Sequence, residues 1–102
     1  MARSPLSADA IAAQLVSLPG WTHSEGAIAK TYTLPTYTGG LVFASAVGAL
    51  CEGMDHHPEM IVGYKKVTVT FMTHDEGNVV TDNDIAAARA VESLGYPKAQ
   101  PA

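Results

Sequence analysis

The sequence of 102 residues has little cysteine and little positive charge. Its single cysteine, Cys51, has no partner for a disulfide within the chain. Six Lys and Arg residues stand against ten Asp and Glu residues, and the formal net charge is −4. Lys65 and Lys66 form the only adjacent basic pair. Because binding to a phosphate backbone requires clustered basic side chains, this composition argues against a nucleic-acid-binding function.

Long apolar runs are also missing. The sequence has no stretch of about 18 apolar residues, so no membrane-spanning helix is expected. The first residues, Met1 to Pro5, lack the apolar stretch of a signal peptide. We therefore expect a cytoplasmic protein that does not associate with membranes.

Apolar residues as such are plentiful. They make up 47% of the chain, and charged residues make up 16%, which allows a substantial buried core. The length fits one domain, so we expect a single domain over residues 1–102 with an ordered core of about residues 6–96. A domain of this size leaves much of its surface exposed, and a homo-oligomer is expected for that reason.

The first third of the sequence predicts a helix followed by a hairpin. Ser7 caps the helix, and one helix face carries an apolar stripe of Ile11, Leu15 and Leu18. Pro19-Gly20 ends the helix. Two strands are predicted over residues 21–24 and 27–33.

The central segment predicts a second helix from Gly39 or Gly40 to Met54. Its apolar stripe consists of Phe43, Val47, Leu50 and Met54. Other positions hold small side chains, namely Ala44, Ser45, Ala46, Gly48 and Ala49. This small face could pack against a second subunit, or it could lie close to the helix's own sheet.

The last part of the sequence predicts a second hairpin and a third helix. Pro58 ends the second helix, and strands are predicted over residues 59–64 and 66–73. A capping box from Thr81 to Asp84 opens the third helix, which runs to about Leu94. The order αββαββα predicts one α+β domain in which helices cover one face of a four-stranded antiparallel sheet.

Three histidines and a glutamate are the candidates for chemistry. Glu52 and His56 are four residues apart, so they would share a helix face, with His56 in the last helical turn. His57, directly before Pro58, would lie outside the helix, and His74 closes the fourth strand. Imidazole titrates near neutral pH, so one histidine can donate a proton while another accepts one. The sequence therefore predicts metal-free general acid–base catalysis.

Each candidate also has a structural interpretation. The histidine pair could be a solvated helix end, and Glu52 could be a surface carboxylate. Asp84 could serve only as a helix cap, and Trp21 is either a core residue or a flat surface for a planar ligand. Three histidines and a glutamate are acceptable zinc ligands, but adjacent histidines lack the His-x3-His spacing of a helical metal site. No metal is expected on that ground.

The spacing of these residues resembles a known signature. Its core is Glu52-x3-His56-His57-Pro58, followed by Tyr64, His74 and Asp84. The match extends from about Leu6 to Leu94 and includes Leu18-Pro19-Gly20-Trp21 and Thr81-x-x-Asp84-Ile85-Ala86. On these motifs the sequence resembles the family of the pterin-4a-carbinolamine dehydratases, also called 4a-hydroxytetrahydrobiopterin dehydratases.

The resemblance implies a hydro-lyase that removes water from 4a-hydroxytetrahydropterin to give the quinonoid dihydropterin, a step in tetrahydrobiopterin recycling. It implies that His56 and His74 are acid–base residues and that His57 binds the substrate and stabilises the leaving group. Glu52 would orient the histidines. The positions associated with substrate binding are Trp21, His57 and Asp84. No cofactor is implied, because the pterin is the substrate.

Two further expectations come with the resemblance. Subunits would associate through sheet edges and the second helix. A non-catalytic role is the alternative function, since relatives with this fold include a transcriptional cofactor and Rubisco assembly factors. A chain that served only as a scaffold could lose its histidines, and this sequence retains them, which favours the enzyme. Departures from the family pattern are Asp55, where many relatives have a neutral polar residue, and Met60, where an aromatic residue is frequent.

Overall fold

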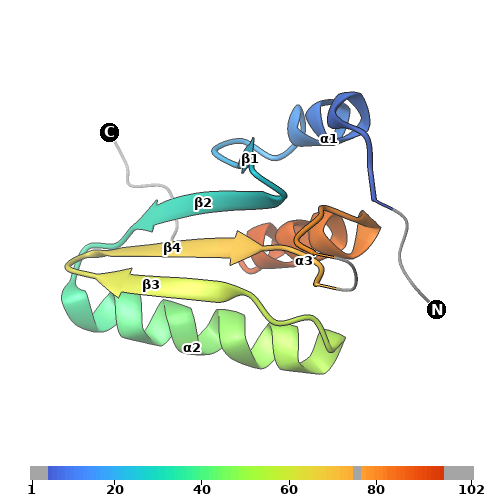
Figure 1. Cartoon of the computed structure of the whole chain (residues 1–102). Helices are drawn as coiled ribbons and strands as arrows, with labels where there is room; N and C mark the ends of the chain where they lie inside the picture. Colours follow the sequence, from blue (N-terminus) through green and yellow to red (C-terminus); the bar gives the residue numbers. More distant parts are fainter. Residues whose placement is uncertain (1–4, 75–76, 96–102) are drawn as a thin grey trace.

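The structure is a computed structural model that describes residues 5–74 and 77–95. Its elements follow the order α-β-β-α-β-β-α (Figure 1), as predicted. They are α1 (Ala8–Leu15), β1 (Thr22–Ser24), β2 (Ala27–Thr33), α2 (Tyr37–Met54), β3 (Glu59–Gly63), β4 (Lys66–Phe71) and α3 (Asp82–Ser93). Residue 96, the last of the predicted ordered core, and residues 75–76 within that core lie outside the described residues.

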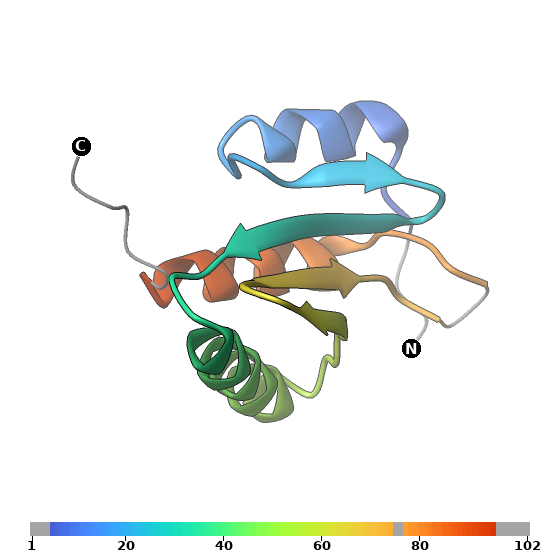
Figure 2. The same cartoon turned by 90° about the vertical axis from the view of Figure 1, so that its left-hand side faces the viewer.

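The four strands form one antiparallel sheet in the order β1-β2-β4-β3. Alternate residues of the two central strands point to the same face and are buried, namely Ile28, Tyr32, Val67, Val69 and Phe71. Tyr32 contacts both long helices from this face: its ring lies 4.6 Å from that of Phe43 in α2, and its hydroxyl donates to Glu92 in α3. The predicted α+β architecture, with helices on one face, is therefore confirmed (Figure 2).

Two helix caps lie at the residues where the sequence predicts them. The Ser7 side chain accepts a hydrogen bond from the backbone N–H of Ala10 and starts α1. Helix α1 ends at Leu15, earlier than predicted, and Leu18 enters the core from the following turn instead. Thr81 and Asp84 form the predicted capping box at the start of α3.

The predicted start of α2 at Gly39 or Gly40 was wrong. The helix begins at Tyr37, because the side chain of Thr36 accepts a hydrogen bond from the N–H of Gly39 and acts as the cap. Glycines are poor helix formers, which hides this start in the sequence. A Cβ at Gly40 would lie 3.5 Å from Val67 Cγ2, an ordinary van der Waals contact.

The buried line of α2 also differs in part from the predicted stripe. Phe43 and Val47 are buried as predicted, but the line continues through Cys51, which is fully buried. Met54 is exposed and Leu50 is only half-buried, so the inclusion of Met54 was wrong.

The small face of α2 divides into two parts. Ala44 and Gly48 are half-buried, and a Cβ at Gly48 would lie 3.9 Å from Met60 Cε in β3. Ser45 and Ala49 are exposed. One part of the small face therefore lies close to the helix's own sheet, and the other faces away from it.

Strand ends differ from prediction by one or two residues. Strand β4 ends at Phe71 rather than Thr73, and Thr73 instead forms an isolated bridge with Val79. Within the described residues, no helix has the length and apolar character required to cross a membrane.

Candidate active site

The end of α2 sets the directions of the two adjacent histidines. Asp55 adopts a left-handed conformation with φ of 54°, which Asp tolerates better than most residues. The backbone N–H of Asp55 donates to the carbonyl of Glu52, and the N–H of His56 donates to that of Cys51, each at 3.2 Å. These two bonds close the helix in a Schellman-type end. His56 is therefore outside the helix, and its predicted place in the last helical turn was wrong.

This helix end changes the predicted pairing of carboxylates with histidines. Glu52 Oε1 lies 2.6 Å from Nε2 of His57 rather than contacting His56. Nε2 of His56 instead lies 2.6 Å from Oδ1 of Asp84, which comes from α3. The left-handed turn at Asp55 rotates His56 away from the helix face that carries Glu52, and this accounts for the exchange of partners.

The two pairs lie in different environments. The side chain of His56 is 13% exposed and that of Asp84 is fully buried, whereas the side chains of His57 and Glu52 are 58% and 77% exposed. The ring of His56 also stacks on that of Phe71, with centroids 6.0 Å apart and planes 16° apart. His56 is thus held in place, and His57 faces solvent.

Asp84 is surrounded by hydrogen-bond donors. Its Oδ2 accepts from the backbone N–H of Thr81 at 2.8 Å and from the hydroxyl of Thr73 at 2.9 Å. The hydroxyls of Thr73 and Thr81 are themselves 2.9 Å apart. Asp84 is therefore both the helix cap that the sequence predicted and the partner of His56, and the two interpretations do not compete.

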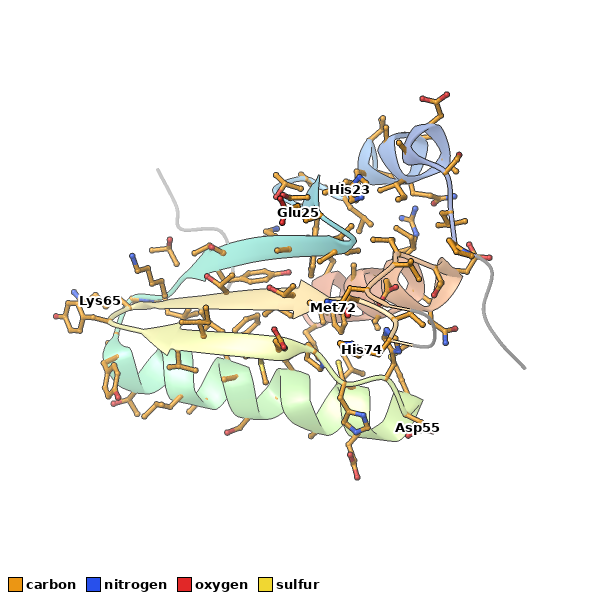
Figure 3. The ribbon with its side chains drawn as sticks, in the orientation of Figure 1. His23, Glu25, Asp55, Lys65, Met72 and His74 are labelled. Atoms are coloured by element: carbon orange, nitrogen blue, oxygen red, sulfur yellow. The ribbon has the colours of Figure 1, made fainter. Side chains whose placement is uncertain are left out.

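His74 lies at the same end of the molecule. It follows Thr73, which contacts Asp84, and Figure 3 shows it at the end of the sheet where α2 terminates at Asp55. Its side chain is exposed, as expected at a sheet rim, and its Nδ1 lies 2.8 Å from Oδ1 of Asn78. The fourth histidine, His23 in β1, is exposed and lies away from this group (Figure 3).

The three histidines share one feature. Each has one ring nitrogen bonded to a side-chain oxygen that can only accept, so that nitrogen carries a proton. Among residues 5–74 and 77–95, the other nitrogen of each ring has no hydrogen-bond partner. These nitrogens are Nδ1 of His56, Nδ1 of His57 and Nε2 of His74. In a neutral ring each is a base, and in a charged ring each is an acid.

Trp21 does not offer its ring to solvent. It is 4% exposed and stacks on Phe71, with centroids 5.9 Å apart. Since Phe71 also stacks on His56, the contact between Trp21 and the candidate site is an indirect one, through the Phe71 ring. Of the two interpretations that the sequence left open for Trp21, the core position is the one observed.

A second polar cluster surrounds Glu92 near the end of α3. Its Oε2 accepts from Lys30 Nζ at 2.9 Å, from Trp21 Nε1 at 3.2 Å and from the hydroxyl of Tyr32. Burial alone would raise the pKa of Glu92, but hydrogen bonds from Tyr32, Lys30 and Trp21 and the charge of Lys30 lower it overall. Burial and the bond to Glu92 raise the pKa of Tyr32 well above its ordinary value. Sequence reasoning missed this cluster.

Other reactive groups are less suited to catalysis. Burial raises the pKa of the Cys51 thiol, so a reactive thiolate is disfavoured. Within the described part of the chain, no three His, Cys, Asp or Glu side chains are grouped so that they could hold a metal ion.

Sequence reasoning also missed Thr73 and Asn78 as partners of the site. Thr73 was detectable, because it lies in the same phase of the fourth strand as Val67, Val69 and Phe71 and so points inward. A polar side chain at an inward position needs a buried partner. Asn78 carries no comparable signal, since turns are commonly polar.

Taken together, the αββαββα fold and three imidazoles oriented by side-chain oxygens define a small α+β protein with a cluster of histidines at one end. Comparison with known proteins is consistent with that class. Residues 4–94 match the family described as pterin 4 alpha carbinolamine dehydratase. The chain belongs to this family.

Individual relatives cover most of both chains. A protein of Streptomyces coelicolor is 33% identical over 94 residues, which are 92% of this chain and 93% of the relative. One from Halobacterium salinarum is 43% identical over 72 residues, 71% of this chain and 78% of the relative. Both carry the name "Putative pterin-4-alpha-carbinolamine dehydratase".

Two solved structures share the fold. The transcriptional coactivator/pterin dehydratase from Brucella melitensis matches with a TM-score of 0.80 and 30% identity, over 89% of this chain and 98% of that one. A pterin dehydratase-like protein, identified as a RuBisCO assembly factor in the alpha-carboxysome, matches with a TM-score of 0.61 and 22% identity, over 76% of this chain and 90% of that one. At that identity the second likeness concerns the fold alone.

Proposed function

We propose that this protein is a hydro-lyase that dehydrates 4a-hydroxytetrahydropterin to the quinonoid dihydropterin, in the recycling of tetrahydropterin. One observation carries the proposal. Three imidazoles at one end of the fold each have one nitrogen held by a side-chain oxygen and the other without a partner among the described residues. Family membership supplies the substrate class.

The reaction needs one proton donor and one proton acceptor. The C4a–O bond breaks and the hydroxyl leaves as water, for which it must gain a proton. A ring N–H of the pterin loses a proton as the new double bond forms, so the net change is the loss of one water. His56 and His74 are proposed as this acid–base pair, because an imidazole can fill either role near neutral pH.

His57 and Glu52 are proposed to act at the outer side of the site. The exposed His57 ring is held by Glu52 at 2.6 Å, so it can bind the substrate and donate to the departing hydroxyl without large rearrangement. Asp84 would act through His56, which it contacts directly. Trp21 would act on the site indirectly, through Phe71, on which it stacks. We propose that the reaction requires no metal or cofactor, since two histidines suffice for both proton transfers.

A direct assay tests the proposal. Dehydration of enzymatically generated 4a-hydroxytetrahydropterin is followed with wild type, His56→Ala and His74→Ala, with and without a chelator. The dehydration rate of each variant should be lower than that of wild type by more than about tenfold, because a positioned acid or base contributes roughly 10²–10⁴-fold to the rate. His23→Ala is the matched control, since His23 is exposed in β1, and it should retain full rate. A wild type no faster than buffer would refute the dehydratase, and inactivation by the chelator would refute a metal-free reaction.

A binding role is the second candidate function, favoured by apolar side chains on an outer strand. Within the described part of the chain, strand β3 pairs with β4 alone, and it exposes Ile61, Val62 and, in the following turn, Tyr64. Strand edges of this kind favour association with another chain. We propose that a second copy of this chain covers the edge, giving a homodimer or homotetramer. Another protein is the alternative partner, and it becomes the leading function if wild type lacks dehydratase activity.

Light scattering tests self-association. Wild type should give the mass of a dimer or tetramer, and Ile61→Lys should shift it toward the monomer, because a charge at the centre of the edge opposes pairing. Val16→Lys is the control, since Val16 is 86% exposed at the end of α1, and the mass should not change. A monomeric wild type would contradict the proposal.

A further inference from the structure

Thr73 is a buried polar residue in a place where the sheet otherwise presents apolar side chains. It follows β4 in the inward phase of Val69 and Phe71, and it is 6% exposed. The isolated bridge between Thr73 and Val79 fixes its backbone, with hydrogen bonds of 2.8 and 3.1 Å. A valine would fill the same volume in an apolar core, so the hydroxyl has to be explained by its contacts.

Those contacts form a directional chain. The hydroxyl of Thr73 has one proton, and it donates this to Oδ2 of Asp84 at 2.9 Å. The Thr81 hydroxyl, 2.9 Å away, then donates to Thr73, and it also lies within 3.5 Å of Oδ2 of Asp84. The Thr81 oxygen in turn accepts from the backbone N–H of Asn83 at 3.3 Å, at the start of α3. Every step points toward the carboxylate of Asp84.

The chain distinguishes the two oxygens of Asp84. Oδ2 receives the Thr73 hydroxyl and the backbone N–H of Thr81, with the Thr81 hydroxyl at 3.5 Å, whereas Oδ1 receives His56 alone among the residues that the structure describes. With Oδ2 held on two sides, the carboxylate cannot rotate, and Oδ1 stays directed at Nε2 of His56. Stacking on Phe71 fixes the plane of the same imidazole ring. Ring plane and hydrogen-bond direction are thus both set.

We infer that Thr73, together with Thr81, is a positioning residue that selects the working nitrogen of His56. By holding Asp84, it keeps the proton on Nε2 of the neutral ring and leaves Nδ1 as the nitrogen that exchanges protons with the substrate. This inference rests on the proposed function for its effect on rate, but the choice of tautomer is a property of the protein alone. Thr73 itself does not touch the reacting atoms.

The tautomer can be read directly. Nitrogen-15 NMR of the full chain, at a pH where imidazole is neutral, should show His56 protonated at Nε2 and unprotonated at Nδ1. Thr73→Val should give a mixture of both tautomers, because Asp84 loses one of the donors that hold it. Thr73→Ser keeps the hydroxyl and should keep the wild-type tautomer. Thr31→Val is the matched control, since it removes the hydroxyl of another threonine pair, Thr31 and Thr68 at 2.8 Å, on the exposed face of the same sheet.

The variant that changes the His56 tautomer should also be the one that loses activity. Thr73→Val should lower kcat by about tenfold with KM changed by less than about twofold, because an acid–base residue in the wrong tautomer loses part of its 10²–10⁴-fold contribution. Thr73→Ser and Thr31→Val should stay within about twofold of wild type.

Several results would overturn the inference. A wild-type His56 protonated at Nδ1 would do so without any variant, even if Thr73→Val failed to fold. An unchanged His56 tautomer in Thr73→Val would also overturn the inference. So would a loss of rate in Thr73→Ser as large as that in Thr73→Val, because altered packing would then explain the loss in both variants. If the tautomers behave as expected but wild type has no dehydratase activity, the proposed function fails while the positioning of His56 stands.

Discussion

Helix α3 carries two buried or half-buried carboxylates that are used in different ways. Glu92, near the end of the helix, accepts three donors on one oxygen, from Trp21, Lys30 and Tyr32. Asp84, in the first turn, divides its donors between two oxygens and reserves Oδ1 for His56. A carboxylate whose donors belong to fixed core elements joins those elements together. A carboxylate that keeps one oxygen for an imidazole can direct proton transfer.

The two clusters are joined through aromatic rings. Phe71 stacks on both Trp21 and His56. Trp21 belongs to the Glu92 cluster, and His56 belongs to the Asp84 cluster. The difference between the clusters therefore lies in hydrogen bonding rather than in separate cores, and substitutions of the two carboxylates can separate catalysis from stability.

The largest expected effect is on activity. Asp84→Asn should lower the dehydration rate by about 10²-fold, since an amide can present a donor to Nε2 of His56 and favour the wrong tautomer. Glu92→Gln, the matched change on the same helix, should stay within about threefold. Rates at saturating pterin are compared after circular dichroism has shown both variants to be folded. Equal losses in the two variants would remove the functional distinction between the carboxylates.

The next effect is on stability. Glu92→Ala should lower the free energy of unfolding by about 2 kcal/mol, because three donors lose their acceptor and each lost bond costs about 0.5–1.5 kcal/mol, less where water can replace it. Urea denaturation followed by Trp21 fluorescence measures the change. Glu52→Ala is the control, since the exposed Glu52 side chain bonds to the exposed His57 and to no other side chain that the structure describes, and it should change stability by less than about 0.5 kcal/mol. Equal destabilisation in both variants would contradict a structural role for the Glu92 cluster.

A smaller effect concerns pH. Folding lowers the pKa of Glu92 from its ordinary value of 4.5, so the folded state favours the carboxylate. The stability that this contributes is present above about pH 4.5 and is lost as the pH falls through the lower pKa of the folded protein. The stability difference between wild type and Glu92→Gln should therefore shrink below that pH. Denaturation curves at a series of acidic pH values measure this stability difference. A difference that grows as the pH falls would contradict a lowered pKa for Glu92.

Stability at alkaline pH tests the role of Tyr32 in the Glu92 cluster. The pKa of Tyr32 is raised above 10.0 in the folded state, so folding favours the neutral phenol. Its contribution is fully present below about pH 10 and is lost as the pH rises toward the folded value. Wild type should lose more stability than Tyr32→Phe between about pH 10 and pH 11. Parallel loss in both proteins would exclude Tyr32 as the cause.

The smallest expected effect is the coupling between the two carboxylates. Asp84 and Glu92 are eight residues apart on one helix, which corresponds to about 12 Å along its axis. When two substituted sites are this far apart and share no partner, their effects on the free energy of unfolding usually add to within about 0.5 kcal/mol. The unfolding free energies of Asp84→Asn, Glu92→Gln and the double variant measure the coupling. A coupling well above that limit would mean that the stack of Trp21, Phe71 and His56 transmits strain between the clusters.

Local patterns in the sequence were enough for most of the fold. Ser7 and the Thr81–Asp84 capping box mark helix starts, and alternation in β2 and β4 identifies the face that is buried. These signals work because caps and strand periodicity depend on residues close together in the chain. Candidate site residues were found in the same way, from the histidine pair beside Pro58 and the histidine after the fourth strand.

The sequence by itself thus determined the elements, their order, the inward face of the sheet and the set of histidines. Only the tertiary structure decided which carboxylate holds which histidine, because the left-handed turn at Asp55 directs His56 to Asp84, 28 residues away, and leaves Glu52 to His57. It also decided that Thr73 supports Asp84 and that Glu92 gathers donors from β2 and Trp21. The physical reason is that such contacts depend on the closeness of segments far apart in the chain, and no periodicity or local spacing records it.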